Sequence, residues 1–164
     1  PKALRTVRRL DLGAVFQDPM TSLNPTMRIG KQVAEAAGSD DEALRLLTDD
    51  ADIRMILLNL MQNAHHAMSA GGTLEVRLSA DDGYAMIEIT DSGVGIQPEI
   101  LARIFDPFFS RRADGVAGTG LGLTIVKNFV ERMGGTISVD SILGRGTQFR
   151  IRLPLAETAL DNGG

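Results

Sequence analysis

The sequence contains no cysteine, no tryptophan and a single tyrosine. The absence of cysteine excludes disulfide bonds and thiolate metal sites, and it fits a reducing compartment. With so few aromatic residues there is no stacking platform for single-stranded nucleic acid, and the net charge of −4 gives no reason to expect nucleic acid as a partner. No apolar run approaches the ~20 residues of a membrane span and no signal peptide is visible, so we expect a cytoplasmic chain without a membrane segment.

What the chain does contain is enough apolar sequence to build one domain. Apolar residues make up 43% of the 164 positions, which supports a core and argues against a disordered chain. We expect a single domain over residues 1–154 and a tail over 155–164. Glycine is unevenly placed, because ten of the eighteen glycines lie between Gly93 and Gly146.

The hydrophobic periodicity predicts helices that alternate with strands. Helices are expected at residues 27–37, 43–48, 51–70, 97–104 and 119–133, and strands at 10–16, 73–80, 84–90, 136–140 and 147–153. Several strands alternate apolar with polar residues, so one face of their sheet is wet and the other is covered. The predicted fold is therefore α+β, a two-layer α/β sandwich with a mostly antiparallel mixed sheet and helices on one face.

The first candidate site is Asp91-Ser92-Gly93-Val94-Gly95, at the end of a predicted strand. Asp91 shares parity with apolar residues of that strand, so it should point to the covered side, where a carboxylate needs a hydrogen-bond donor. The exocyclic amine of adenine fits, whereas guanine offers an oxygen at that place. Gly93 and Gly95 would let the backbone turn and lie close to a ring. An ordinary turn after a strand is the alternative.

A second glycine cluster, Gly118-Thr119-Gly120-Leu121-Gly122, precedes a predicted helix. Free N–H groups at a helix start attract phosphate, and glycine permits close approach. The cluster is not the dinucleotide-binding fingerprint, because no strand runs directly into it and its third spacing differs. A flexible loop before a helix is the alternative.

Asn59 and Asn63 lie four residues apart on the predicted 51–70 helix, beside its apolar stripe. An amide oxygen there could reach a hard cation such as Mg²⁺. Asparagine is a mediocre helix former, so two asparagines on one helix face indicate a functional role. A polar helix flank is the simpler alternative. His65 and His66 are adjacent, so they point to different sides and cannot form an i, i+4 metal pair; we expect a structural or surface role for both.

Three of the six phenylalanines, Phe105, Phe108 and Phe109, surround Pro107. They precede residues 110–117, which have the composition of a short flexible loop. The phenylalanines are either core residues or a hinge that anchors a lid over a nucleotide, with Arg111 or Arg112 reaching a phosphate.

In their order and spacing, four segments resemble the N, G1, F and G2 boxes of sensor histidine kinases. They are 59–64, 91–95, 105–109 and 118–123, and Gly144-Arg145-Gly146-Thr147 resembles the glycine motif near the end of that domain. The resemblance covers about residues 50–154 and implies the Bergerat-type ATP-binding fold. The short lid looks most like that of the nitrogen-regulator type of kinase.

The resemblance also implies roles for individual residues. Asn63 would hold Mg²⁺, Asn59 would assist, Asp91 would bind adenine, and residues 106–117 would form the ATP lid. The other residues expected at the nucleotide are Gly93, Gly95, Phe108, Arg111, Arg112, Gly118, Gly120, Leu121, Gly122 and Thr147. Relatives with this fold, such as gyrase and Hsp90, usually carry glutamate as a general base where Asn59 stands, so its absence favours phosphotransfer over hydrolysis.

The function implied is that of a histidine kinase catalytic domain that passes the γ-phosphate of Mg-ATP to a histidine on a separate dimerisation and phosphoacceptor domain, with a response regulator as an indirect partner. The phosphoacceptor helix itself is missing, and neither His65 nor His66 matches its motif. The alternatives are a binding-only scaffold with this fold and an ATPase of the gyrase or Hsp90 class.

Residues 14–35 resemble a different family, the oligopeptide ABC-transporter ATPases, in the region of their Q-loop. The likeness begins with Val15-Phe16-Gln17-Asp18-Pro19 and runs through Ala34-Glu35, although the chain has neither a Gly-x-x-x-x-Gly-Lys-Ser/Thr loop nor a Leu-Ser-Gly-Gly signature. This predicts a chimera in which residues 14–37 replace the kinase's own first strand and helix. Natural sequence drift is the alternative.

Overall fold

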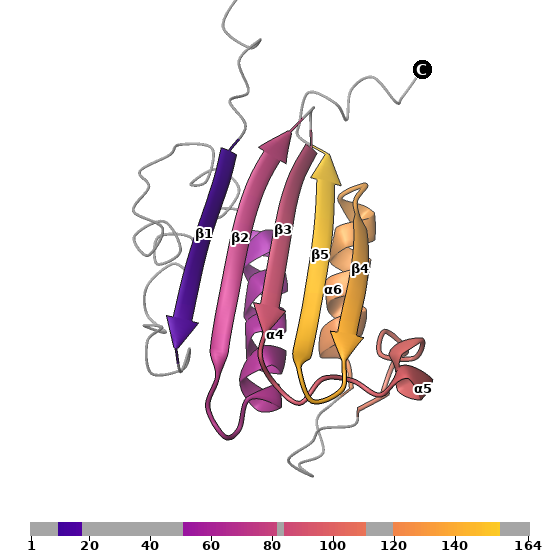
Figure 1. The fold of residues 1–164 in the computed structure, drawn as a ribbon. Helices are drawn as coiled ribbons and strands as arrows, with labels where there is room; N and C mark the ends of the chain where they lie inside the picture. The colour runs from indigo at the N-terminus through magenta and orange to yellow at the C-terminus, as the bar shows by residue number, and fades with distance from the viewer. Residues whose placement is uncertain (1–9, 18–50, 82–83, 111–119, 155–164) are drawn as a thin grey trace, which may run out of the picture.

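The computed structural model describes residues 10–17, 51–81, 84–110 and 120–154. Within them lie five strands and three helices, labelled as in Figure 1: β1 (Leu10–Gln17), α4 (Ala51–Ala67), β2 (Thr73–Asp81), β3 (Tyr84–Asp91), α5 (Pro98–Leu101), α6 (Gly122–Arg132), β4 (Thr136–Ile142) and β5 (Gly146–Pro154). The helices expected at 27–37 and 43–48 and the tail at 155–164 lie outside the described residues.

The five strands form one sheet in the order β1-β2-β3-β5-β4, and every neighbouring pair is antiparallel. Helices α4 and α6 cover the same face of this sheet, and the short α5 lies beyond the end of β4 (Figure 1). The two-layer α/β sandwich is therefore confirmed. The prediction allowed a mixed sheet, but the pairings among the described strands are all antiparallel.

The core lies between the sheet and the two long helices, because each element is apolar on one side. The buried residues of α4 are Ile53, Ile56, Leu57, Leu60, Met61 and Ala64. They pack with Val126 and Val130 of α6 and with the inward residues of the strands, Leu74, Val76, Leu78, Ile87, Ile89, Phe149, Ile151 and Leu153. Fully burying one such aliphatic side chain contributes about 1.5–3 kcal/mol, so this layer dominates the stability of the domain.

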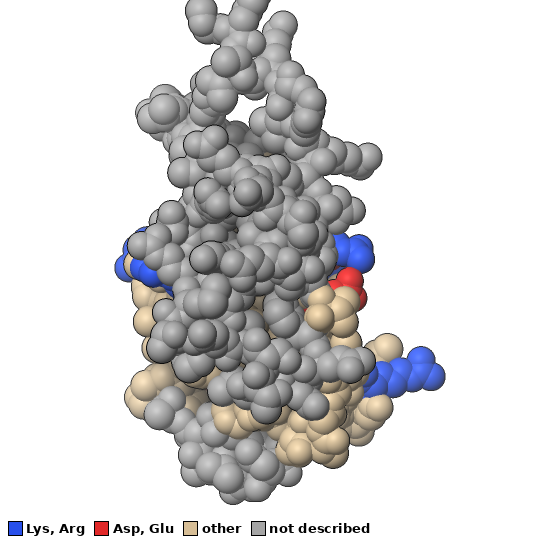
Figure 2. Space-filling model, turned by 90° about the vertical axis from the view of Figure 1, so that its left-hand side faces the viewer, with Lys and Arg blue, Asp and Glu red and all other residues tan. Residues whose placement is uncertain are grey.

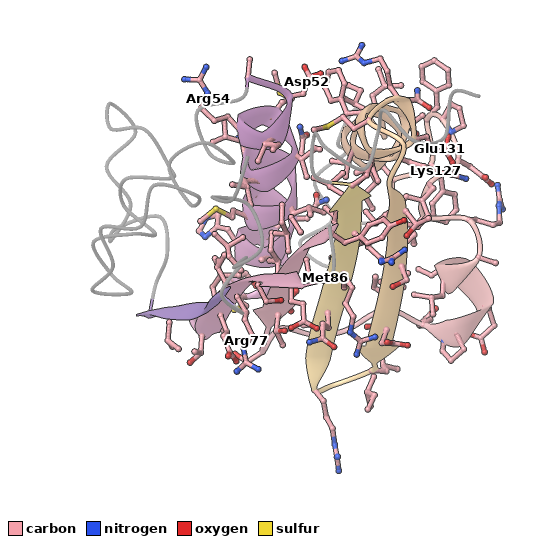
Figure 3. All side chains as sticks on the ribbon, turned by 90° about the horizontal axis from the view of Figure 1, so that it is seen from above. Asp52, Arg54, Arg77, Met86, Lys127 and Glu131 are labelled. Atoms are coloured by element: carbon pink, nitrogen blue, oxygen red, sulfur yellow. The ribbon has the colours of Figure 1, made fainter. Side chains whose placement is uncertain are left out.

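The opposite face of the sheet is polar and carries ion pairs. Arg150 on β5 contacts Glu88 on β3 and Asp140 on β4, which links three neighbouring strands. Figure 3 shows Arg77 projecting from the side of the sheet away from α4. Exposed ion pairs of this kind contribute about 0–1 kcal/mol each, so we assign this face little weight in stability.

All three described helices are shorter than the sequence predicts. The helix expected at 51–70 ends at Ala67, the one expected at 97–104 is regular only over Pro98–Leu101, and the one expected at 119–133 spans Gly122–Arg132. Gly120 has a φ of 68°, in the left-handed region, which is incompatible with a right-handed helix. The second glycine cluster therefore forms the approach to α6 rather than its first turn.

On the side of β1, few of the visible described residues carry charge. Figure 2 views the molecule from that side, and the described atoms visible there are mostly neither acidic nor basic, with Lys and Arg side chains at the margins. Among the described residues, no helix is long and apolar enough to cross a membrane.

Candidate functional site

A pocket of about 500 Å³ lies beside α4, at the end of the sheet where β3 finishes. Its walls come from one face of α4, the connection after β3, the stretch from Ile100 to Ser110, the start of α6 and the β4–β5 hairpin. These segments are distant in sequence. The pocket is therefore a product of the fold, and it gathers most of the candidate residues in one place.

Asp91 is the last residue of β3 and lines this pocket. Its side chain is on the covered side of the sheet and the residue is only 6% exposed, which confirms the parity argument. Oδ1 accepts a hydrogen bond from the Gly93 backbone N–H, with an N···O distance of 2.9 Å. Burial raises the pKa of the Asp91 carboxyl, while the backbone N–H groups of Gly93 and Thr147 act in the opposite direction. A carboxylate offers about four acceptor sites, so acceptor capacity remains for a ligand.

The two glycines after Asp91 are required by close packing. A Cβ at Gly93 would lie 2.5 Å from the carbonyl oxygen of Ala67, and one at Gly95, where φ is 72°, would lie 2.2 Å from that of Ile142. Val94 N–H also donates to the Ala67 carbonyl at 3.0 Å. Gly95 lines the pocket, whereas Gly93 is buried and does not line it. The loop is thus pressed against the end of α4 on one side and against the β4–β5 hairpin on the other.

The β4–β5 hairpin fixes this loop through Ser141. Its Oγ accepts from Ile96 N–H at 2.8 Å, donates to the Gly146 carbonyl at 3.0 Å and lies 2.9 Å from Thr147 Oγ1. Gly144 N–H donates to the Val94 carbonyl at 2.7 Å. Sequence reasoning missed Ser141. The available signal was its parity, because it follows Ile137 and Val139 on the inward side of β4 and is a polar residue there.

Asn59 and Asn63 both line the pocket from α4. Asn59 Nδ2 donates to the Met55 carbonyl at 2.9 Å, and its Oδ1 would lie 2.9 Å from a Cβ placed on Gly122. Gly122 therefore allows the start of α6 to approach α4. Asn63 Nδ2 is buried and has no hydrogen-bond partner in the described chain. A buried polar group without a partner costs about 1–3 kcal/mol, which indicates a ligand at this point.

The side-chain amides of Asn59 and Asn63 also determine which kind of cation could bind in the pocket. The described residues hold no group of three or more His, Cys, Asp or Glu side chains able to bind a metal ion. Rotation of the Asn63 amide presents Oδ1 in place of Nδ2. An oxygen donor of this kind suits Mg²⁺, which takes one or two protein oxygens and completes its shell with phosphate and water. The residues present therefore fit Mg²⁺ bound together with a phosphate ligand.

The approach to α6 forms the remaining wall. Gly120 and Gly122 line the pocket, and a Cβ at Gly120 would lie 2.5 Å from the Phe108 carbonyl carbon. Phe108 N–H donates to the Gly120 carbonyl at 3.0 Å. The N-cap residue of α6, Leu121, provides no side-chain cap. The first N–H groups of this helix thus lie beside the pocket without a side-chain acceptor from their own N-cap.

The structure does not bring every predicted residue to the pocket. Phe108 has a φ of 62°, is 77% exposed and does not line it, whereas Phe109 does. Leu121 is half-buried outside the lining. Arg111, Arg112 and Gly118 lie outside the described residues, so their contacts with a nucleotide stay a prediction. Conversely, Thr147 lines the pocket as expected, and His66 lines it although a structural or surface role was expected.

Comparison with known proteins places this chain in a protein family. Residues 48–157 match the family model described as histidine kinase-, DNA gyrase B-, and HSP90-like ATPase. The sensor histidine kinase ZraS of Salmonella typhimurium is 44% identical over 117 residues, which are 70% of this chain and 24% of that protein. The ZraS of Escherichia coli strain K12 is 36% identical over 170 residues, 98% of this chain and 35% of that protein.

Solved structures of histidine kinases are also similar to this chain. The mycobacterial sensor histidine kinase MprB gives a TM-score of 0.57 at 37% identity and covers 63% of this chain and 72% of that one. The chain belongs to the histidine kinase-, DNA gyrase B- and HSP90-like ATPase family. Within it, the relatives identify the chain as the ATP-binding catalytic domain of a histidine kinase.

The chain spans about a quarter of the length of the Salmonella relative, 24%. The family match begins at residue 48, so it does not reach the segment that resembles an ABC-transporter ATPase. Of that segment, residues 14–17 belong to β1, which pairs with β2, and the rest lies outside the described residues. The chimera stays a prediction.

Proposed function

We propose that the chain binds Mg-ATP in this pocket and transfers the γ-phosphate to a histidine on a separate dimerisation and phosphoacceptor domain. The observation that carries the proposal is that one pocket is lined by both the buried carboxylate of Asp91 and the unpartnered buried amide of Asn63. The first suits the amine of adenine and the second suits a cation bound to phosphate.

The spacing along α4 supports this orientation. Ala67 contacts the loop that follows Asp91, and Asn59 contacts Gly122 at the start of α6. These two residues are about 12 Å apart along the helix axis at a rise of ~1.5 Å per residue. That length suits a nucleotide lying along α4, with adenine beside Asp91 and the phosphates beside the start of α6.

Each residue then has a definite task. Asp91 accepts a hydrogen bond from the adenine amine and disfavours guanine, whose oxygen would face the carboxylate. Asn63 Oδ1 holds Mg²⁺, which when bound neutralises phosphate charge. The N–H groups at the start of α6 stabilise phosphate oxygens. Asn59 carries an amide, which cannot take a proton from water, and this favours transfer to a protein acceptor over hydrolysis.

The remaining parts of the proposal concern partners. The phosphoacceptor histidine comes from outside the described residues, a response regulator receives the phosphate in turn, and the reaction takes place in the cytoplasm, where ATP is available. In the lid that the family resemblance implies, we expect Arg111 or Arg112 to contact phosphate; both lie outside the described residues.

The binding half is tested by titrating ADP, with and without Mg²⁺, into the chain and two variants. Asp91→Asn should weaken binding by about 10- to 100-fold, because it replaces a charge-assisted hydrogen bond. Asn63→Ala should remove the gain in affinity that Mg²⁺ brings. Asn128→Ala, on the exposed side of α6, is the matched control. Equal ADP affinity in the wild type and Asp91→Asn would show that Asp91 does not bind adenine.

The transfer half is tested with labelled ATP and a separate dimerisation and phosphoacceptor domain from a similar kinase. Label on the histidine of that domain, lost with Asp91→Asn, is the expected result. Steady phosphate release without a protein acceptor would contradict transfer and favour hydrolysis.

A further inference from the structure

Ser141 lies behind the pocket wall and is bonded to two residues that line it. It is a half-buried inward residue of β4 and is not itself part of the pocket lining. Its Oγ accepts from the backbone N–H of Ile96 and lies 2.9 Å from Thr147 Oγ1, and both of these residues line the pocket. Any effect of Ser141 on a ligand must therefore pass through these neighbours.

Thr147 lies directly beside the carboxylate that is proposed to bind the adenine amine. Asp91 and Thr147 are paired residues of the β3–β5 ladder, and both are buried, at 6% and 5% exposure. Paired side chains on one face of an antiparallel ladder have Cβ atoms about 4.5–5.5 Å apart. The backbone N–H of Thr147 also bonds to the Asp91 carboxyl. A base whose amine reaches Asp91 therefore brings the atom beside that amine to the Thr147 hydroxyl.

The edge of adenine at this point requires a hydrogen-bond donor from the protein. Adenine presents a ring nitrogen on each side of its amine, N1 and N7, and each of them only accepts. A threonine hydroxyl has a single hydrogen to donate and lone pairs to accept with. Thr147 can therefore bond to either ring nitrogen only when its own hydroxyl hydrogen points to the base.

Ser141 can provide the hydrogen bond that Thr147 then needs. A serine hydroxyl carries one hydrogen, and two acceptors lie within reach of it: the Gly146 carbonyl at 3.0 Å and Thr147 Oγ1 at 2.9 Å, where either hydroxyl can be the donor. Without a nucleotide, Ser141 donates to Gly146 and accepts from Thr147, so both hydroxyl hydrogens are bonded. With a nucleotide, Ser141 donates to Thr147, and the Thr147 hydrogen turns to the base.

We infer that Ser141 is a positioning residue for base recognition, which holds the Thr147 side chain so that its hydroxyl donates to the ring nitrogen beside the adenine amine. The inference rests on the proposed function and adds a second selective contact to that of Asp91. In Ser141→Ala, Thr147 Oγ1 loses the hydroxyl that holds it in place. The ring nitrogen then loses its donor, whereas the amine keeps the carboxylate of Asp91.

The test measures, in the presence of Mg²⁺, the dissociation constants of ADP and of its 1-deaza, 7-deaza and 3-deaza analogues, in each of which CH replaces one ring nitrogen. The wild type should bind either the 1-deaza or the 7-deaza analogue about three- to ten-fold more weakly than ADP, since one neutral hydrogen bond is lost. Ser141→Ala should bind ADP more weakly and lose this difference between ADP and the analogue. Ser141→Thr keeps a hydroxyl and should keep the difference.

Ser138→Ala makes the same substitution on the exposed side of β4 and should behave as the wild type. The 3-deaza analogue is the ligand control, because N3 lies away from the amine, and its affinity relative to ADP should be the same in all variants. Thermal unfolding of each ligand-free variant shows that the comparison is made between folded proteins.

The outcomes separate a positioning role from a structural one. A deaza penalty of equal size in the wild type and Ser141→Ala overturns the inference, because a merely structural serine would affect ADP and its analogues alike. A wild type that binds the 1-deaza and 7-deaza analogues as tightly as ADP overturns it as well, and this measurement needs no variant. Failure of the wild type to bind ADP at all would instead defeat the proposed function.

Discussion

At the scale of single residues, Asp91 shows a conflict between stability and ligand binding. Desolvation raises the pKa of its carboxyl above the ordinary value, and this effect exceeds that of the two backbone N–H groups that lower it. A carboxyl whose folded-state pKa is raised contributes stability that is present below its unfolded pKa and is lost as the pH rises through the folded pKa. Above its folded-state pKa, the ionised Asp91 carboxylate therefore destabilises the nucleotide-free domain, and a ligand donor relieves this cost.

Asp91→Asn should raise the unfolding midpoint of the nucleotide-free domain at pH 7. The amide is neutral and removes the desolvation cost of the charge, while Oδ1 still accepts from Gly93. Near pH 3 wild-type Asp91 is itself protonated, so the variant should bring little gain there. Thermal denaturation at both pH values checks this, and a gain of equal size at the two would contradict the electrostatic explanation.

At the scale of elements, the loop after β3 is held in place by backbone contacts rather than by its own side chains. Gly95 touches the hairpin residue Ile142, and Gly144 N–H bonds to the Val94 carbonyl. Gly144 also has a positive φ, 79°, but a Cβ there would have no heavy atom within 4 Å. The two glycines therefore separate the effect of backbone conformation from the effect of close approach.

Gly95→Ala should destabilise the domain clearly more than Gly144→Ala. Both variants pay about 1–2 kcal/mol for a left-handed conformation, and Gly95→Ala must in addition displace the Ile142 carbonyl. Urea denaturation gives the two free energies of unfolding. Gly95→Ala should also weaken ADP binding, because the loop carries Asp91. Similar losses of stability in the two variants would show that the contact with Ile142 is soft.

The sequence predicted the layers of the fold better than the local detail of the site. Alternation along β3 and the apolar stripe of α4 were enough to orient Asp91 and to place Asn59 and Asn63 at the pocket. The start of α6 was wrong by three residues, because the conformation of Gly120 depends on its contact with Phe108, which is remote in sequence. The role of Ser141 depends on the β4–β5 pairing and on Ile96, and no local pattern encodes either contact.

At the scale of the whole molecule, an exposed ion pair joins α4 to α6. Asp52 at the start of α4 pairs with Arg132 at the end of α6, and Lys127 pairs with Glu131 along α6 itself, where Figure 3 shows both side chains. Exposed pairs contribute little, so α4 and α6 are held together mainly by the apolar layer beneath them. A ligand that touches both helices and the sheet should stabilise all of them at once.

Saturating Mg-ADP should therefore raise the unfolding temperature of the domain. At a ligand concentration about 100-fold above the dissociation constant, the gain is about 2.7 kcal/mol, which corresponds to several degrees in a domain of this size. Differential scanning fluorimetry measures the shift. Asp91→Asn should show a much smaller shift at the same ADP concentration, and an unchanged midpoint in the wild type would favour a scaffold without nucleotide binding.

The order of the strands has a consequence for how the domain assembles. The pairs β2–β3 and β4–β5 are hairpins between consecutive strands, and the β3–β5 ladder joins them. Each hairpin closes a short stretch of chain, whereas the joining ladder must close a longer one and pays more conformational entropy. Asp91 belongs to the first hairpin, and Ser141 and Thr147 to the second. Competence to bind nucleotide should consequently appear only when the two hairpins have docked, and ADP would distinguish finished domains from half-folded ones.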